Sequence, residues 1–122
     1  MSIDVPTKGC TMSELRNIDV AEALALVSDG ALLLDVREDN EWKAGHAADA
    51  THVALSEVPD HLEDFAKDRL IVCVCRSGGR SARAATFLLQ SGYDAINLEG
   101  GMLAWAGDEQ PLVGDGDEPS IM

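Results

Sequence analysis

The sequence has few basic residues: 9 Lys and Arg stand against 22 Asp and Glu in 122 residues, which gives a formal net charge of −13. Nucleic acids and anionic membrane surfaces are bound by basic faces, and this chain has little from which to build one. The composition therefore predicts that neither a nucleic acid nor a membrane is a partner.

Long apolar runs and aromatic residues are also scarce. The chain contains no stretch of 18 uncharged apolar residues, and residues 1–10 lack the apolar run of a secretory signal peptide. Aromatic residues make up 4% of a chain that is 46% hydrophobic, so its core must consist mainly of Ala, Val, Leu and Ile, as in helix-flanked sheets. We expect a soluble, cytoplasmic protein, a monomer or weak dimer, that folds as one compact domain.

The three cysteines, Cys10, Cys73 and Cys75, are an odd number in a sequence without an export signal, so we expect reduced thiols rather than a disulfide framework. Cys73 lies inside an apolar run and is interpreted as a small core residue, although a disulfide with Cys75 is an alternative. The histidines show no metal-ligand spacing, so no metal site is predicted. Cys10 belongs to an N-terminal arm and is interpreted as having no role in the reaction. The alternative is that it reaches the loop and reacts with an intermediate on Cys75.

Short apolar runs alternate with helical patterns along the chain. The runs predict strands at 15–18, 31–36, 51–54, 70–75 and 94–98, and the helical spacing predicts helices at 19–28, 39–44, 56–67, 81–91 and 101–106. This alternation is typical of an α/β domain with a mostly parallel sheet and helices on both faces. We expect an N-terminal arm at 1–13, one domain at 14–113 and an acidic tail at 114–122.

The most apolar predicted strand, 70–75, ends at Cys75 and leads directly into Arg76-Ser-Gly-Gly-Arg-Ser81. In parallel α/β sheets, ligands bind outside the carboxyl ends of the strands. The two glycines allow a tight loop whose amide N–H groups turn toward one point, and these amides, together with the following helix N-terminus, favour a thiolate. A buried core thiol is the alternative interpretation. The pattern indicates a nucleophilic Cys75 with an anion cradle formed by Arg76, Ser77, Gly78, Gly79, Arg80 and Ser81.

Three segments, in order, resemble the rhodanese-like sulfurtransferases. Cys75 to Ser81 resembles the active-site loop of that family, Leu34-Asp-Val-Arg37 with Glu41 and Gly45-His46 its first signature, and Leu98-Glu-Gly-Gly-Met-Leu-Ala-Trp105 its closing signature. The match covers about residues 15–113. It implies the single-domain rhodanese fold, a three-layer arrangement with a five-stranded parallel sheet between helices, and no metal or organic cofactor.

The resemblance also implies a mechanism. A small anionic sulfur donor such as thiosulfate would pass its outer sulfur to Cys75, sulfite would leave, and an anionic persulfide would form within the amides of the loop. Cyanide, a small thiol or a thioredoxin-like protein would then take the sulfur. Asp35 and Arg37, which follow a predicted buried strand, are expected to support the loops around the site through hydrogen bonds and an ion pair.

The length of the active-site loop distinguishes sulfurtransferases from the related phosphatases and arsenate reductases. The related phosphatases and arsenate reductases place five residues between Cys and Arg, whereas four lie between Cys75 and Arg80. The shorter ring favours sulfur transfer, while a phosphatase or arsenate reductase and a non-catalytic persulfide carrier or binding module remain alternatives. Two-domain thiosulfate enzymes carry a substrate-binding Arg where this chain has Glu41, so anion binding would rest on the loop alone and thiosulfate affinity is expected to be weak.

Overall fold

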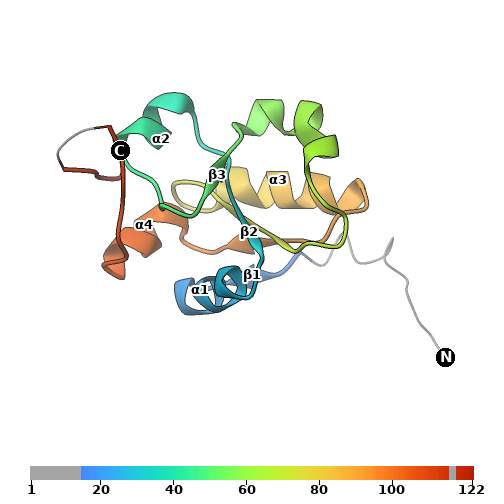
Figure 1. The fold of residues 1–122 in the computed structure, drawn as a ribbon, viewed down its shortest axis with the longest axis horizontal. Coiled ribbons are helices and arrows are strands. Elements are labelled where there is room, and N and C mark those ends of the chain that lie inside the picture. Colours follow the sequence, from blue (N-terminus) through green and yellow to red (C-terminus); the bar gives the residue numbers. More distant parts are fainter. Residues whose placement is uncertain (1–14, 116–117) are drawn as a thin grey trace.

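A computed structural model describes residues 15–115 and 118–122, which form a five-stranded parallel sheet between two layers of helices (Figure 1). The strands are β1 (Asn17–Ile18), β2 (Leu32–Asp35), β3 (Thr51–His52), β4 (Ile71–Val74) and β5 (Ala95–Leu98), in the order β1-β5-β4-β2-β3. The helices are α1 (Val20–Ser28), α2 (Asp39–Ala44), η2 (Leu55–Asp64), α3 (Gly79–Gln90) and α4 (Gly101–Gly107). The predicted α/β fold is therefore confirmed. The predicted arm at 1–13, with Cys10, lies outside the described residues.

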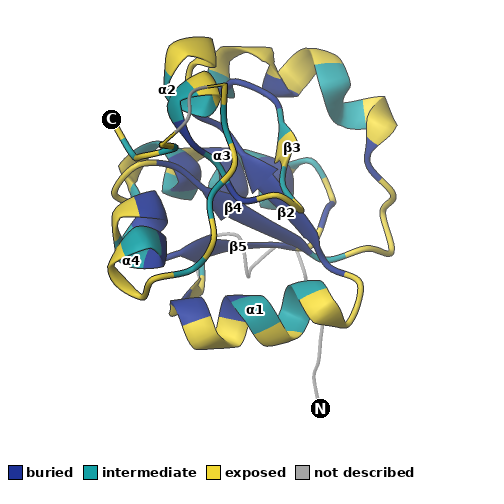
Figure 2. Cartoon of the chain, turned by 60° about the vertical axis from the view of Figure 1, so that its left-hand side comes forward, coloured by how far each residue is buried: buried dark blue, intermediate teal, exposed yellow. Residues whose placement is uncertain are grey.

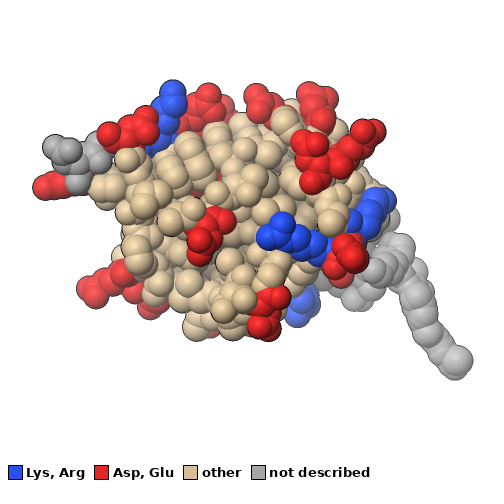
Figure 3. Space-filling view, in the orientation of Figure 1, with Lys and Arg blue, Asp and Glu red and all other residues tan. Residues whose placement is uncertain are grey.

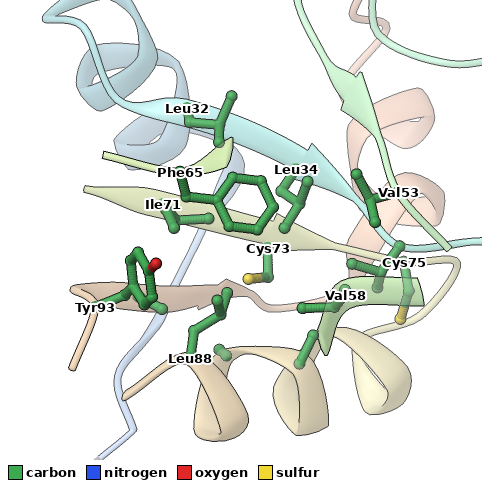
Figure 4. Close-up of a cluster of buried hydrophobic side chains, with 14 residues drawn as sticks. Leu32, Leu34, Val53, Val58, Phe65, Ile71, Cys73, Cys75, Leu88 and Tyr93 are labelled. Atoms are coloured by element: carbon green, nitrogen blue, oxygen red, sulfur yellow. The ribbon is translucent and has the colours of Figure 1, made fainter. Parts of the chain in front are cut away.

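Strand alternation divides the buried residues into one core on each face of the sheet. The face covered by α3 and η2 includes Leu34, Val58, Cys73, Cys75 and Leu88. The face covered by α1 and α4 includes Val20, Leu33, Val72, Met102 and Trp105. Figure 2 shows the buried strands between helices whose outer sides are exposed, and Figure 4 shows Cys73 and Cys75 within the first core. Successive side chains of a strand point to opposite faces of the sheet, so Cys73 and Cys75, which are two positions apart, lie on the same face.

The helix predicted at 56–67 is present as η2, but it is a 3₁₀ helix that begins at Leu55 and ends at Asp64. Pro59 lies inside this helix, where it has no N–H to donate and where its ring would meet the carbonyl of Leu55 in an α-helix. The other differences are smaller, since α3 begins at Gly79 rather than Ser81 and β3 is two residues long.

The connections place a crevice between β2 and β4. The chain leaves β2 through α2 toward the edge strand β3, and it leaves the neighbouring strand β4 through α3 toward β5 on the other side. Ligand sites of open α/β sheets lie outside the carboxyl ends of two such strands. Asp35 ends β2 and Cys75 follows β4, so both lie at this crevice.

The described part of the predicted tail packs against the end of α2. The amide of Asp115 donates to the carbonyl of Lys43 at 2.9 Å, and the amide of Ser120 donates to the carbonyl of Ala44 at 2.9 Å. In Figure 1 the C-terminus accordingly lies beside α2.

Acidic residues outnumber basic ones in the sequence, 22 to 9. On the face shown in Figure 3 they are spread around most of the outline, and the basic groups are confined to a few places. Within residues 15–115 and 118–122, no helix combines the length and the apolar character needed to cross a membrane.

Candidate active site

The Cys75 side chain lies inside the loop that connects β4 to α3, and the residue is 1% exposed. Its Sγ accepts a hydrogen bond from the Gly78 amide at 3.1 Å and lies 3.3 Å from the Ser81 hydroxyl oxygen. Gly78 has a φ of +120°, which residues with a side chain rarely adopt, and this conformation helps turn the loop back toward the sulfur. The loop thus surrounds the sulfur with hydrogen-bond donors.

These donors change the acidity of Cys75. Burial alone would raise the pKa of the thiol, but hydrogen bonds from the Ser81 hydroxyl and from the amides of Ser81, Gly78 and Ser77 outweigh it and lower the pKa. Cys73 shows the opposite behaviour, because burial, together with the nearby Cys75, raises its pKa. Both thiols are free. Cys75 is therefore the thiol poised to ionise, and Cys73 is a protonated core residue.

The first turn of α4 holds the backbone of the loop. The Met102 amide donates to the carbonyl of Cys75 at 2.7 Å, and the Leu103 amide donates to the carbonyl of Arg76 at 3.0 Å. Gly101 permits this approach, because a Cβ at this position would collide with the Cys75 carbonyl oxygen. The Gly-Gly pair at 100–101 belongs to the closing signature, but its packing role was not predicted from the sequence.

Asn97 is a second residue that the sequence analysis missed. It is 4% exposed on β5, accepts a hydrogen bond from the Ser81 hydroxyl, and donates to the carbonyl of Gly78 at 3.2 Å and to Asn17 Oδ1 at 2.8 Å. It therefore links the loop to the two adjacent strands β5 and β1. An amide within the otherwise apolar run Ala95–Leu98 is the signal that could have revealed it.

Both arginines of the predicted anion cradle already have partners. Arg80 Nη1 and Nη2 donate to the two carboxylate oxygens of Glu41 at 2.7 and 2.9 Å, and Arg76 Nε donates to the backbone oxygen of Met122 at 2.6 Å. The hydrogen bond from Arg80, offset in part by burial, lowers the pKa of Glu41 to about 2, and the same pairing raises the pKa of Arg80. The amides rather than the guanidinium groups therefore contact the sulfur.

Asp35 and Arg37, the predicted supporting residues, form a fully buried ion pair. Arg37 donates through Nε and Nη2 to the Asp35 carboxylate at 2.9 and 2.7 Å, and Nη2 also donates to the carbonyl of Gly45 at 2.7 Å. Because Gly45 directly follows α2, this pair anchors α2 to the end of β2.

A groove of about 420 Å³ lies next to the loop, between η2 and α3. Its lining includes both apolar and charged residues: Leu55, Val58, Pro59, Phe87, Glu38, Arg80 and Arg83. Within the part of the chain that the structure describes, no cluster of three or more His, Cys, Asp or Glu residues could hold a metal ion.

Comparison with known proteins relates this loop to a family. The Rhodanese-like domain family matches residues 19–108. A sulfurtransferase of Allochromatium vinosum is 36% identical over 103 residues, which cover 84% of this chain and 95% of the relative. The thiosulfate sulfurtransferase GlpE of Pseudomonas entomophila is 34% identical over 95 residues, or 77% of this chain and 87% of that protein.

A solved structure extends the similarity to the fold. The rhodanese-related protein of Thermoplasma volcanium superimposes with a TM-score of 0.75 at 31% identity, over 80% of this chain and 97% of that one. The parallel sheet, the cysteine loop after its central strand and the sequence matches agree, and the chain belongs to the rhodanese-like domain family.

Proposed function

We propose that this protein is a sulfurtransferase that moves sulfane sulfur from thiosulfate, or a related donor, through a persulfide on Cys75 to a thiol or cyanide acceptor. The observation that carries the proposal is the Cys75 thiol, which is surrounded by donors that favour its ionised form. The similarity to relatives named as sulfurtransferases supports the same reaction class.

The reaction consists of two displacements at sulfur. In the first, the Cys75 thiolate attacks the outer sulfur of thiosulfate, a new S–S bond forms, and the S–S bond of the donor breaks as sulfite leaves with the electron pair. In the second, cyanide or an acceptor thiolate attacks the outer persulfide sulfur and releases the Cys75 thiolate. Charge is conserved in both steps, and the enzyme alternates between two forms, which predicts ping-pong kinetics.

The loop serves both forms of the enzyme. Donors at fixed positions stabilise an anion without having to reorganise, and the outer sulfur of a persulfide is an anion close to the position of the thiolate. The amides of Ser77, Gly78 and Ser81 are the proposed contacts. A thiol that is already ionised needs no general base, so no histidine is assigned to the reaction.

The loop geometry argues against oxyanion chemistry. Only four residues separate Cys75 from Arg80, and the Arg80 guanidinium is paired with Glu41 through both terminal nitrogens. A phosphatase or arsenate reductase needs that arginine to hold a tetrahedral oxyanion. We therefore rank sulfur transfer first.

The proposed location of the protein is the cytoplasm. Its reduced thiols and a thiol acceptor, either a small thiol or a thioredoxin-like protein, are consistent with this location.

The test is turnover of thiosulfate and cyanide to thiocyanate by the purified protein, with Cys75→Ser and Cys73→Ser as the matched pair. We expect activity in the wild type and Cys73→Ser, none in Cys75→Ser, and parallel double-reciprocal plots. Hydrolysis of an aryl phosphate or reduction of arsenate that is lost in Cys75→Ser, without thiocyanate formation, would replace this proposal with the alternative chemistry. A persulfide that forms on Cys75 but that no acceptor can remove would indicate a carrier.

A further inference from the structure

Glu41 holds Arg80 in a two-point ion pair at the first turn of α3. The paired atoms are 2.7 and 2.9 Å apart, and the side chains of Glu41 and Arg80 are 13% and 33% exposed. Parallel hydrogen bonds between guanidinium and carboxylate are charge-assisted and fix the planes of both groups. The pair is therefore a defined structural element rather than a loose surface contact.

The position of Glu41 is set by contacts that do not involve Arg80. Its Oε1 accepts a hydrogen bond from the Glu38 amide at 3.0 Å, at the start of α2. At the other end of α2, Gly45 is bound by Arg37, which is buried with Asp35. Because β2 and β4 are neighbours, α2 and the loop after β4 meet at the same crevice. The fold thus presents a carboxylate to Arg80 before any substrate binds.

This pairing changes the charge that a donor meets. Without Glu41, the cradle would offer a full guanidinium charge five residues after Cys75; with Glu41 present, that charge is balanced and both terminal nitrogens are engaged. Arg76, the other arginine of the loop, is exposed and donates its Nε to Met122. Thiosulfate carries two negative charges into this balanced site on a protein with a net charge of −13. A donor with one negative charge meets less repulsion and needs the arginine less.

On the basis of the proposed sulfur transfer, we propose that Glu41 is a specificity-determining residue: by holding Arg80, it weakens binding of dianionic thiosulfate and favours sulfane-sulfur donors that carry one negative charge, such as organic persulfides and thiosulfonates. For a thiosulfonate, the Cys75 thiolate attacks the outer sulfur, the S–S bond of the donor breaks, and a sulfinate leaves with the electron pair. The products are the same Cys75 persulfide and one monoanion, so atoms and charge balance.

The experiment compares two donors in the Glu41→Gln variant. Thiosulfate and methanethiosulfonate both deliver an outer sulfur and differ in charge, and cyanide serves as the common acceptor. The start of α2 keeps its contact in this variant, because the amide oxygen of the introduced glutamine can still accept from the Glu38 amide. We expect the KM for thiosulfate to fall about tenfold, the effect of one gained charge-assisted hydrogen bond. The KM for methanethiosulfonate should change less than about threefold, with kcat little altered for either donor.

Three controls make the result specific. Glu22→Gln removes the same charge from the exposed surface of α1 and should leave both KM values unchanged. Glu41→Gln combined with Arg80→Gln should lose the gain for thiosulfate, because the gain depends on the released guanidinium. Glu41→Asp, whose shorter side chain cannot reach Arg80 as well, should lower the KM for thiosulfate by a smaller factor and provides a second variant if Glu41→Gln folds poorly.

The outcomes for the two proposals are distinct. If the wild type loads sulfur on Cys75 but the KM for thiosulfate is unchanged or higher in both Glu41 variants, the role of Glu41 is wrong and the sulfurtransferase proposal stands. An equal fall in KM for both donors also contradicts selection by charge. If neither donor loads sulfur on wild-type Cys75, the proposed function itself fails.

Discussion

Replacing Ser81 with alanine tests how the loop lowers the pKa of Cys75. The Ser81 hydroxyl has one proton and three acceptors in reach: Cys75 Sγ and the Gly78 carbonyl, both at 3.3 Å, and the Asn97 side-chain oxygen. Since one proton serves one acceptor at a time, we expect it to turn toward the sulfur when Cys75 ionises. Ser81→Ala removes this donor and leaves the backbone amides in place.

The size of the effect follows from the geometry. A hydrogen bond to a charged group contributes about 1.5–3 kcal/mol, and we expect the lower limit here because the contact to sulfur is long and the proton is shared. About 1.4 kcal/mol corresponds to a tenfold smaller thiolate fraction at a pH below the pKa. A more basic thiolate is intrinsically about threefold more nucleophilic, since reactivity rises with roughly the square root of basicity. The net result is alkylation about threefold slower at low pH.

The assay is the rate of iodoacetamide alkylation as a function of pH, measured in a Cys10→Ser background so that the remaining thiols are Cys75 and Cys73, whose pKa is raised. Because the pKa of Cys75 is lowered in the folded protein, the wild-type rate rises at a lower pH than that of an ordinary thiol and then reaches a plateau. In Ser81→Ala the rise moves to higher pH and the plateau is higher, so the two curves cross. Ser28→Ala, at the end of α1, is the matched control.

A rise at the same pH or at lower pH in Ser81→Ala, in a protein whose fold is intact, would refute this account of the cradle. It would mean that the backbone amides alone set the acidity of Cys75 and that the hydroxyl serves only Asn97.

Two further predictions concern the support of the loop. Gly101→Ala should lower the free energy of unfolding by roughly 2 kcal/mol or more and reduce turnover, because its Cβ would collide with the Cys75 carbonyl oxygen. Gly107→Ala is the control and should leave the free energy of unfolding unchanged, because its Cβ meets no atom within 4 Å. Equal stability of the two variants in urea unfolding would contradict the close packing of α4 on the loop. Asp35→Asn should lower the free energy of unfolding by about 3–5 kcal/mol, since it leaves Arg37 buried without its counter-charge. The double variant Asp35→Leu with Arg37→Met should lower the free energy of unfolding by less than Asp35→Asn does, because it removes both charges. A larger decrease in the double variant would argue against a desolvated ion pair.

The elements that carry the nucleophile were predictable because they depend on local patterns. The apolar run predicted at 70–75 contains the buried strand β4 (Ile71–Val74), and Cys75 directly follows it. The helix predicted at 19–28 is α1, and the Asp19 side chain accepts a hydrogen bond from the Glu22 amide at its start. The type of helix in η2 was predicted less well: Pro59 is early enough in the predicted segment 56–67 to be placed in a first turn, but the helix begins at Leu55, so that Pro59 lies inside it.

The contacts that complete the site were not predictable in the same way, because they join residues far apart in the chain. Glu41 and Arg80 are 39 positions apart, and Asn97 and Asn17 are 80 apart. Charge and spacing identified Arg80 as a cation near the cysteine, but only the adjacency of β2 and β4 shows that a carboxylate already holds it. The sequence therefore predicts the chemistry of the loop better than it predicts the choice of donor.

The most direct test of the central claim is the mass of the intact protein after treatment with thiosulfate and removal of the excess. The account predicts the gain of one sulfur atom that maps to Cys75, persists in Cys73→Ser, is absent from Cys75→Ser, and disappears when cyanide is added. A Cys75 that remains unmodified while it still reacts fully with alkylating reagents would contradict the claim that this loop stabilises a persulfide.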